Sequence, residues 1–261
     1  MKSISASTKS AIRTALVYTL ALLPFALIGG WCTGIYSFND LYDEATRQAI
    51  LAQLGSLDEF CLAVSVQYLV YTAFCGFTGF LLAKAVGLFR PFGFERRATT
   101  AALALSVACG ALFALDRPVF GRLIPGVAAL YEGGLSAANL LASVLLGGIV
   151  EEVMLRLFLM SLLALLFWKL FFRSRNRAEI PEGVFVAANI VSALAFAAGH
   201  LPATVSTFGG LTPLLVFRCF LLNGAFGLAF GWLYRRYGIW YAMLGHITVH
   251  VVSKLFWLAF I

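Results

Sequence analysis

Residues 137–168, AANLLASVLLGGIVEEVMLRLFLMSLLALLFW, form the stretch that decides how this chain folds. The stretch is almost entirely apolar, and as an α-helix it would extend about 48 Å at 1.5 Å per residue. The hydrocarbon core of a bilayer is about 30 Å thick, so a single crossing must tilt, kink or protrude. We expect the helix to become irregular at Gly147 and Gly148.

The composition of the whole chain also indicates a membrane protein. Of its 261 residues, 61% are hydrophobic and 12% are charged, whereas soluble domains carry about 25% charged residues. Six further apolar runs come near the roughly 20 residues that a membrane-spanning helix needs. They lie at 12–31, 60–83, 99–115, 184–201, 213–233 and 238–260. The alternating pattern of a membrane barrel is absent, so we predict an all-α fold, a polytopic bundle of about seven transmembrane helices.

The chain has no internal repeat and no loop long enough for a soluble domain. We therefore predict a single integral membrane domain over residues 1–261, with N-terminal helices over 1–115 and a motif-bearing core over about 137–260. The first apolar run has a basic start, as in a signal peptide, but no small-residue cleavage site follows it, so we expect it to be retained. The five scattered cysteines lack CxxC spacing, which predicts buried packing rather than disulfides or a metal site.

The distribution of the net charge of +7 predicts how the chain is oriented. Basic residues lie in short segments beside the spans: the N-terminus, the loops around 90–97 and 169–177, and the pair Arg235 and Arg236. This is the positive-inside pattern and not the basic face of a nucleic-acid-binding protein. We predict that these segments are cytoplasmic and that segments 32–57 and 201–211 lie outside. The protein would then be a multi-pass integral membrane protein, in the inner membrane if the chain is bacterial.

Three ionisable side chains, Glu151, Glu152 and Arg156, interrupt the long apolar run. A charge at the bilayer centre costs about 2.5–3.5 kcal/mol on insertion scales, and pairing offsets part of that cost. Residues four apart are neighbours on a helix, so we expect Glu152 and Arg156 to pair, whereas Glu151 points about 100° away. One interpretation of the pair is a purely structural role in locking two helices together, and the other is a place in a functional site. Glu151 is left as the candidate general base.

The chain contains only three histidines, and all of them lie in or at the ends of apolar runs in its last third. His246 and His250 are four residues apart and therefore share one helix face, while His200 belongs to another run. A single membrane histidine usually forms a hydrogen bond between helices, but all three together indicate a shared site. Two further cations in apolar runs, Arg218 and Lys254, are expected to pair across the bundle or to extend to the interface, and not to be catalytic.

In order and spacing, these segments resemble the signature of the CPBP family of intramembrane proteases, also called Abi or CAAX-protease-like. The family carries EExxxR, FxxxH and HxxxN or HxxxD on separate transmembrane helices. This chain has Glu151-Glu152-xxx-Arg156, Phe196-xxx-His200 and His246-xxx-His250, and GWLYRRYGIWYAMLGHITVH is similar to the family's approach to its third motif. Two positions differ: Leu157 stands where glycine is frequent, and His250 stands where the family usually has Asn or Asp. The resemblance covers about residues 140–256.

The resemblance implies an intramembrane endopeptidase that acts on a membrane-bound peptide or protein, with the lipid bilayer as its surroundings and no nucleic acid. It implies that Glu151 and His200 activate a water, that His246 and His250 stabilise the oxyanion, and that Glu152 and Arg156 belong to the same site. Descriptions of the family include both metal-free and metal-dependent mechanisms. His200, His246 and His250 with a glutamate would be a plausible zinc set, but HITVH lacks the glutamate of HExxH. We favour no cofactor, with zinc as the alternative.

Other functions use the same residues differently. A non-catalytic scaffold or immunity-type protein would need the polar cluster only for folding. Proton-coupled transport would use the buried glutamate and histidines, but the two-fold repeat typical of transporters is absent. A haem held by two histidines would make the purified protein coloured.

Overall fold

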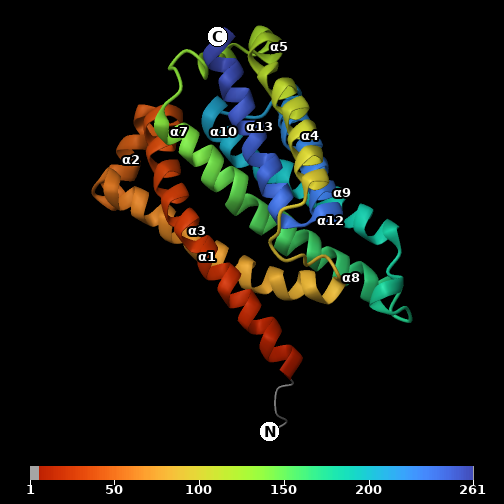
Figure 1. Ribbon diagram of the computed structural model, residues 1–261. Coiled ribbons are helices and arrows are strands. Elements are labelled where there is room, and N and C mark those ends of the chain that lie inside the picture. Colours follow the sequence, from red (N-terminus) through yellow and green to blue (C-terminus); the bar gives the residue numbers. More distant parts are fainter. Residues whose placement is uncertain (1–5, 261) are drawn as a thin grey trace.

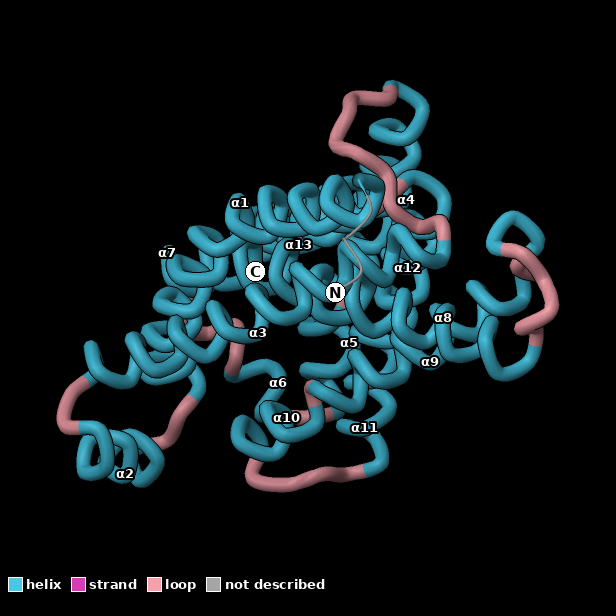
Figure 2. The backbone as a smooth tube through the Cα atoms, turned by 90° about the horizontal axis from the view of Figure 1, so that it is seen from below, coloured by secondary structure: helices cyan, strands magenta, loops and turns pink. Residues whose placement is uncertain are grey.

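The structure is a computed structural model that describes residues 6–260, and this range is 86% helical and contains no strand. Seven of its helical segments are long and apolar enough to cross a membrane. They run over Thr8–Leu41, Leu57–Val86, Arg96–Leu123, Ala137–Phe171, Glu182–Phe208, Pro213–Tyr237 and Ile239–Phe260. The predicted all-α class and the seven predicted crossings are both confirmed. Figure 2 shows how little of the chain lies outside helices.

The first two spans form an antiparallel pair. Helix α1 (Ala6–Tyr36) ends in a π-helical turn (Ser37–Leu41), and α3 (Leu57–Val86) returns alongside it (Figure 1). Between them lies the short exposed helix α2 (Glu44–Leu54), whose N-terminus is capped by Asp43: the carboxylate accepts a hydrogen bond from the Thr46 backbone N–H at 2.8 Å. This helix was not predicted, because its length and composition do not distinguish it from a loop.

The third span packs along the last one. Helix α4 (Arg96–Ala114) lies beside α13 (Ile239–Phe260), which ends at the opposite end of the bundle from the start of α1 (Figure 1). The segment after α4 folds into two short helices, α5 (Asp116–Leu123) and α6 (Pro125–Ala129).

The long apolar run is the centre of the bundle and is irregular. It begins as α7 (Ala137–Leu141), continues as two π-helical segments, η2 (Ala142–Glu151) and η3 (Val153–Met160), and ends as α8 (Ser161–Phe171). Such widened i→i+5 turns are rare and concentrate at functional sites. The irregularity expected at the two adjacent glycines is confirmed, and it extends beyond them in both directions.

The last third of the chain contains two interrupted spans. A 3₁₀ turn (Arg177–Glu179) leads into α9 (Glu182–Gly199), and a second helix, α10 (Leu201–Phe208), follows directly. The next span consists of α11 (Pro213–Cys219), a π-helical turn (Phe220–Gly224) and α12 (Ala225–Tyr237). Helices α9, α12 and α13 pack around η2 and η3.

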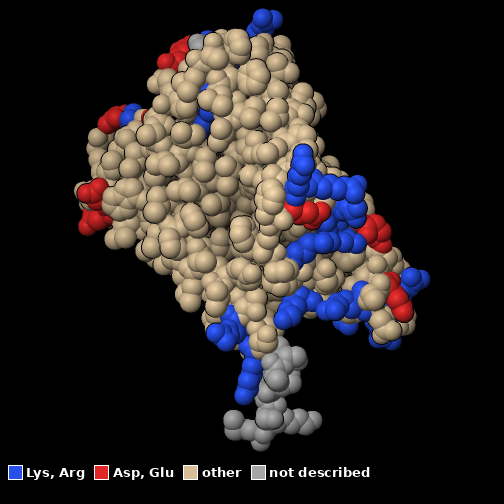
Figure 3. Space-filling model, in the orientation of Figure 1, with Lys and Arg blue, Asp and Glu red and all other residues tan. Residues whose placement is uncertain are grey.

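Charge and cysteine placement agree with a protein embedded in a membrane. Lys and Arg side chains gather toward the lower end of the bundle, around the start of α1 and the loops after α3 and α8, while the upper part of the same view is mostly uncharged (Figure 3). All five cysteines are free and buried, as predicted. The protein is therefore a multi-pass integral membrane protein, and the side on which each end lies stays a prediction.

Candidate active site

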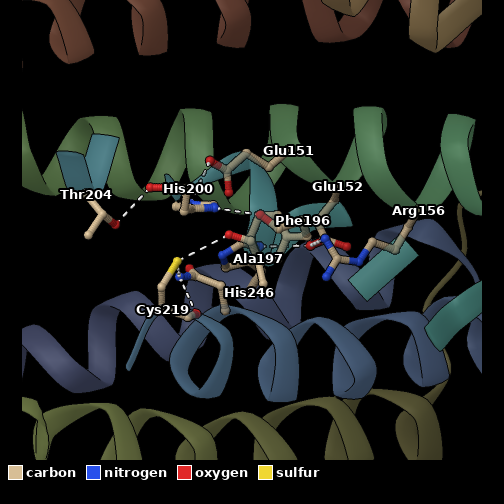
Figure 4. Close-up of polar contacts among 10 residues, drawn as sticks. Glu151, Glu152, Arg156, Phe196, Ala197, His200, Thr204, Cys219 and His246 are labelled. Carbon is tan, nitrogen blue, oxygen red and sulfur yellow. Dashed lines mark hydrogen bonds and ion pairs between the residues drawn. The ribbon is translucent and has the colours of Figure 1, made fainter. Parts of the chain in front are cut away.

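The two adjacent glutamates lie in different surroundings. Glu152 is completely buried, and its Oε1 lies 3.1 Å from Nη1 of Arg156, whose side chain is 1% exposed. The Glu151 side chain is 23% exposed and turns toward a cavity (Figure 4). The predicted Glu152–Arg156 pair is confirmed. The alignment of the pair does not meet hydrogen-bond geometry, so it is held as an ion pair.

Glu152 has a second partner that the sequence did not reveal. Nδ1 of His246 lies 2.8 Å from the same Oε1 atom (Figure 4). A carboxylate only accepts hydrogen bonds, so Nδ1 carries the proton and Nε2 is the nitrogen left for a ligand. The buried carboxylate therefore sets the orientation of His246. Only the packing of α13 against the long central span brings these two residues together.

His200 lies where α9 ends. Its backbone forms the C-cap of α9, and α10 starts at the next residue. The ring Nδ1 lies 2.9 Å from the carbonyl oxygen of Phe196, so Nδ1 donates to it, and Nε2 lies 4.0 Å from Oε1 of Glu151 (Figure 4). The fifth span is therefore interrupted at His200 itself.

His250 completes a stack of rings. Its ring lies 4.9 Å from that of His246 with an interplanar angle of 21°, and Phe230 stacks on the other face of His246 at 4.4 Å. A Cβ atom on Gly147 would approach Nε2 of His250 to 2.9 Å, so only glycine leaves room for the ring there. Nδ1 of His250 is buried and makes no hydrogen bond. The orientation of this ring is thus set by packing.

Aromatic side chains hold the buried cation. The guanidinium of Arg156 lies 4.7 Å from the ring centre of Phe196 and 5.6 Å from that of Phe230, a distance suited to cation–π attraction. Phe196 also meets the His200 ring edge-on at 4.7 Å. Phe196 was identified as part of a motif. Phe230 was missed, because an aromatic residue in an apolar span carries no signal of its own.

One cavity of about 350 Å³ joins these residues and extends toward the end of the bundle where α13 terminates. Glu151, His200, His246 and His250 all line it. The outer part of its wall includes Asp116, Tyr131, Arg218, Lys254 and Trp257. Side chains from three separate spans are therefore brought to one space.

The histidines do not form a metal-binding group in this arrangement. Across residues 6–260, no set of three His, Cys, Asp or Glu side chains lies in a position to hold a metal ion. The rings of His246 and His250 stack on each other at 4.9 Å instead of pointing at a common centre. In the part of the chain that the structure describes, the three histidines and a glutamate are thus not gathered around one centre.

The fold and the cavity define a polytopic membrane protein with a carboxylate and histidines gathered inside its helix bundle. Comparison with known families agrees with the motifs: residues 133–252 match the family described as type II CAAX prenyl endopeptidase Rce1-like. Over this region, which is under half of the chain, the protein is similar to CAAX-protease-type membrane peptidases of the CPBP family. Searches of curated proteins and of solved structures found no match.

Proposed function

We propose that the protein is an intramembrane endopeptidase that hydrolyses a peptide bond of a membrane-associated or lipidated substrate. The observation that carries the proposal is the 4.0 Å separation of Glu151 Oε1 and His200 Nε2 at the wall of the cavity. This separation is too long for a direct hydrogen bond. It suits a water molecule that bonds to both atoms, which is the arrangement needed to activate the water.

In the proposed reaction the Glu151 carboxylate removes a proton from the water while His200 Nε2 orients it. The water oxygen attacks the carbonyl carbon of the scissile peptide bond and forms a tetrahedral oxyanion. When the carbon–nitrogen bond breaks, the proton taken by Glu151 passes to the leaving amine, and the carboxylate is restored. Glu151 therefore acts first as base and then as acid.

His246 and His250 are proposed to stabilise the oxyanion. Glu152 accepts a hydrogen bond from Nδ1 of His246 at 2.8 Å. Nε2 of that ring can therefore donate a hydrogen bond to the oxyanion only when the ring is protonated. The negative charge of the oxyanion favours the protonated ring. His250 is stacked on His246 and lines the same cavity. Removing one such donor from an oxyanion site costs about 10²–10³ in kcat. Glu152 and Arg156 are proposed to act through His246 as positioning residues.

The decisive experiment replaces the proposed base. Glu151→Gln keeps the size of the side chain but removes its basicity, so cleavage should fall by about 10²–10⁴-fold, the usual contribution of a general base. Purified protein in nanodiscs would be incubated with a peptide library that includes S-farnesylated Cys-a-a-X members, and products would be identified by mass spectrometry.

Glu179→Gln is the matched control, because Glu179 is exposed in the loop between the fourth and fifth spans. It should cleave like the wild type. Wild-type cleavage that persists in Glu151→Gln would contradict the proposal. A wild-type protein that cleaves no library member, while its polar variants fail to accumulate, would favour the non-catalytic scaffold.

Metal dependence is tested separately. Because no set of three His, Cys, Asp or Glu side chains within residues 6–260 is placed to hold a metal ion, we propose that the reaction needs no metal. Cleavage should be unchanged after prolonged treatment with EDTA or 1,10-phenanthroline and removal of the chelator. Loss of activity that returns on adding zinc would show that the metal-free proposal is wrong.

A further inference from the structure

A lysine that the proposed mechanism does not use lies in the wall of the cavity. Lys254 belongs to α13, one helical turn beyond His250 and two turns beyond His246. The residue is 8% exposed, and it lines the same cavity as Glu151 and His200. A lysine that extended to the membrane interface would be largely exposed at its tip, so this side chain does not fit that expectation.

Lys254 has no acidic partner among the described residues. No ion pair or hydrogen bond of its ammonium occurs in residues 6–260, although it was expected to pair across the bundle. The other cation of the cavity wall, Arg218, does pair: Nε lies 2.7 Å and Nη2 2.5 Å from the two carboxylate oxygens of Asp116. Tyr131 also donates to Asp116, at 2.9 Å.

The two glutamates near the cavity also have other partners. Glu152 serves Arg156 and His246, while Glu151 faces His200. Lys254 is therefore the one cation lining the cavity, within residues 6–260, whose charge is not balanced by a neighbour. A buried charge without a partner is costly to maintain, and an ionisable residue within a membrane span indicates a functional site.

The position of Lys254 relative to the histidines indicates where a ligand charge would lie. Four residues of α-helix separate it from His250, which is about 6 Å along the axis. An extended peptide covers about 3.3–3.6 Å per residue. A negative group held by Lys254 would thus belong to the substrate only a few residues from the scissile bond. The charge-assisted hydrogen bond from an ammonium to a carboxylate is among the stronger polar contacts in proteins.

From these observations we infer that Lys254 binds a carboxylate of the peptide substrate within a few residues of the bond that is cut. The inference rests on the proposed function, and it makes Lys254 a substrate-binding residue. The carboxylate is either the C-terminal one, which would restrict the enzyme to releasing short C-terminal peptides, or that of an Asp or Glu side chain.

A binding experiment tests this without requiring cleavage. The full-length Glu151→Gln protein, held in nanodiscs on a resin, is offered two randomised apolar octapeptide libraries with different fluorophores. One library ends in a free carboxylate and the other in a carboxamide. The carboxylate library should be retained about 10-fold or more over the carboxamide library, as expected for one charge-assisted hydrogen bond. A third library, amidated but with one Asp among its last three residues, distinguishes a side-chain carboxylate from the C-terminal one.

Variants of Lys254 test whether this lysine causes the preference for a carboxylate. Adding Lys254→Met or Lys254→Gln should bring the retention ratio of carboxylate over carboxamide to about one, and adding Lys254→Arg should keep the preference because the charge is kept. Lys169→Met is the control: its ammonium lies over the Trp168 ring in the last turn of α8, outside the cavity, and its loss should leave the ratio unchanged.

Equal retention of all three libraries by the Glu151→Gln parent would overturn the inference even if no Lys254 variant folds. A preference for a carboxylate that persists in Lys254→Gln would overturn it as well. The cleavage assay reports on the proposed function separately. Cleavage without any carboxylate preference would refute only the role of Lys254, and a preference without cleavage would refute only the peptidase.

Discussion

One carboxylate oxygen in this protein serves two partners. Oε1 of Glu152 lies within 3.1 Å of Arg156 and 2.8 Å of His246, while Oε2 is buried without a hydrogen bond. The three side chains are almost completely enclosed, so their charges are stabilised by each other and by the aromatic rings around the guanidinium. Removing any member would leave the others in an apolar interior.

This leads to a prediction about stability. Glu152→Ala leaves the Arg156 cation buried without its counter-ion and should lower the free energy of unfolding by about 3–5 kcal/mol, the usual cost of breaking a buried pair. Glu182→Ala is the control, since Glu182 pairs with Arg235 at 2.6 Å but its side chain is 66% exposed. That pair should contribute about 0–1 kcal/mol. Denaturant unfolding in detergent measures both, and equal losses would contradict the prediction.

At the level of the helices, the site depends on how closely α13 approaches the irregular central span. A Cβ atom on Gly148 would overlap the side chain of Ile247, and one on Gly147 would press on His250. Two adjacent glycines thus let the helix that carries both histidines reach the segment that carries both glutamates. His200 lies at the break between α9 and α10, 4.0 Å from Glu151.

Gly148→Ala should therefore affect both packing and catalysis. The added methyl group forces α13 away from η2 and is expected to cost about 1–3 kcal/mol, as overpacking usually does, and cleavage should fall because His246 and His250 move with α13. Gly183→Ala is the matched control: nothing lies within 4 Å of its Cβ position. Thermal unfolding and cleavage should both stay near wild type for Gly183→Ala, and the same result for Gly148→Ala would show that this contact is unimportant.

The molecule as a whole has one basic end. Most Lys and Arg side chains in view gather near the loops after α3 and α8, away from the end toward which the cavity extends (Figure 3). Under the positive-inside rule the basic end faces the cytoplasm. The cavity would then open toward the outer side of the membrane.

Cysteine labelling tests this orientation. Ser206→Cys, on the exposed side of α10, should react with a membrane-impermeant maleimide on intact cells, whereas Arg173→Cys, in the basic loop after α8, should react only after permeabilisation. The wild-type chain provides the background, because its five cysteines are buried. The opposite labelling pattern would mean that the cavity opens toward the cytoplasm.

Much of this organisation was predictable from the order of residues alone. Seven apolar runs predicted the seven spans. In lipid the backbone N–H and C=O groups must bond to each other, and a long apolar segment satisfies them by forming a helix. The Glu152–Arg156 pair was equally predictable, because residues four apart on a helix are always neighbours. Adjacent glycines in an overlong span indicated where the central helix becomes irregular.

Contacts between spans were decided only by the tertiary structure. Nothing in the spacing of His246 indicated that Glu152 would orient it, or that Phe230 would stack on its other face. Asp116 and Arg218 lie 102 residues apart and pair, whereas Lys254, expected to pair across the bundle or to extend to the interface, is buried and has no ion-pair partner among the residues described. The spacing of residues in the sequence predicts which side chains are neighbours along one helix. Which faces of different helices meet depends on packing across the bundle, where one glycine or one break in a helix determines the outcome.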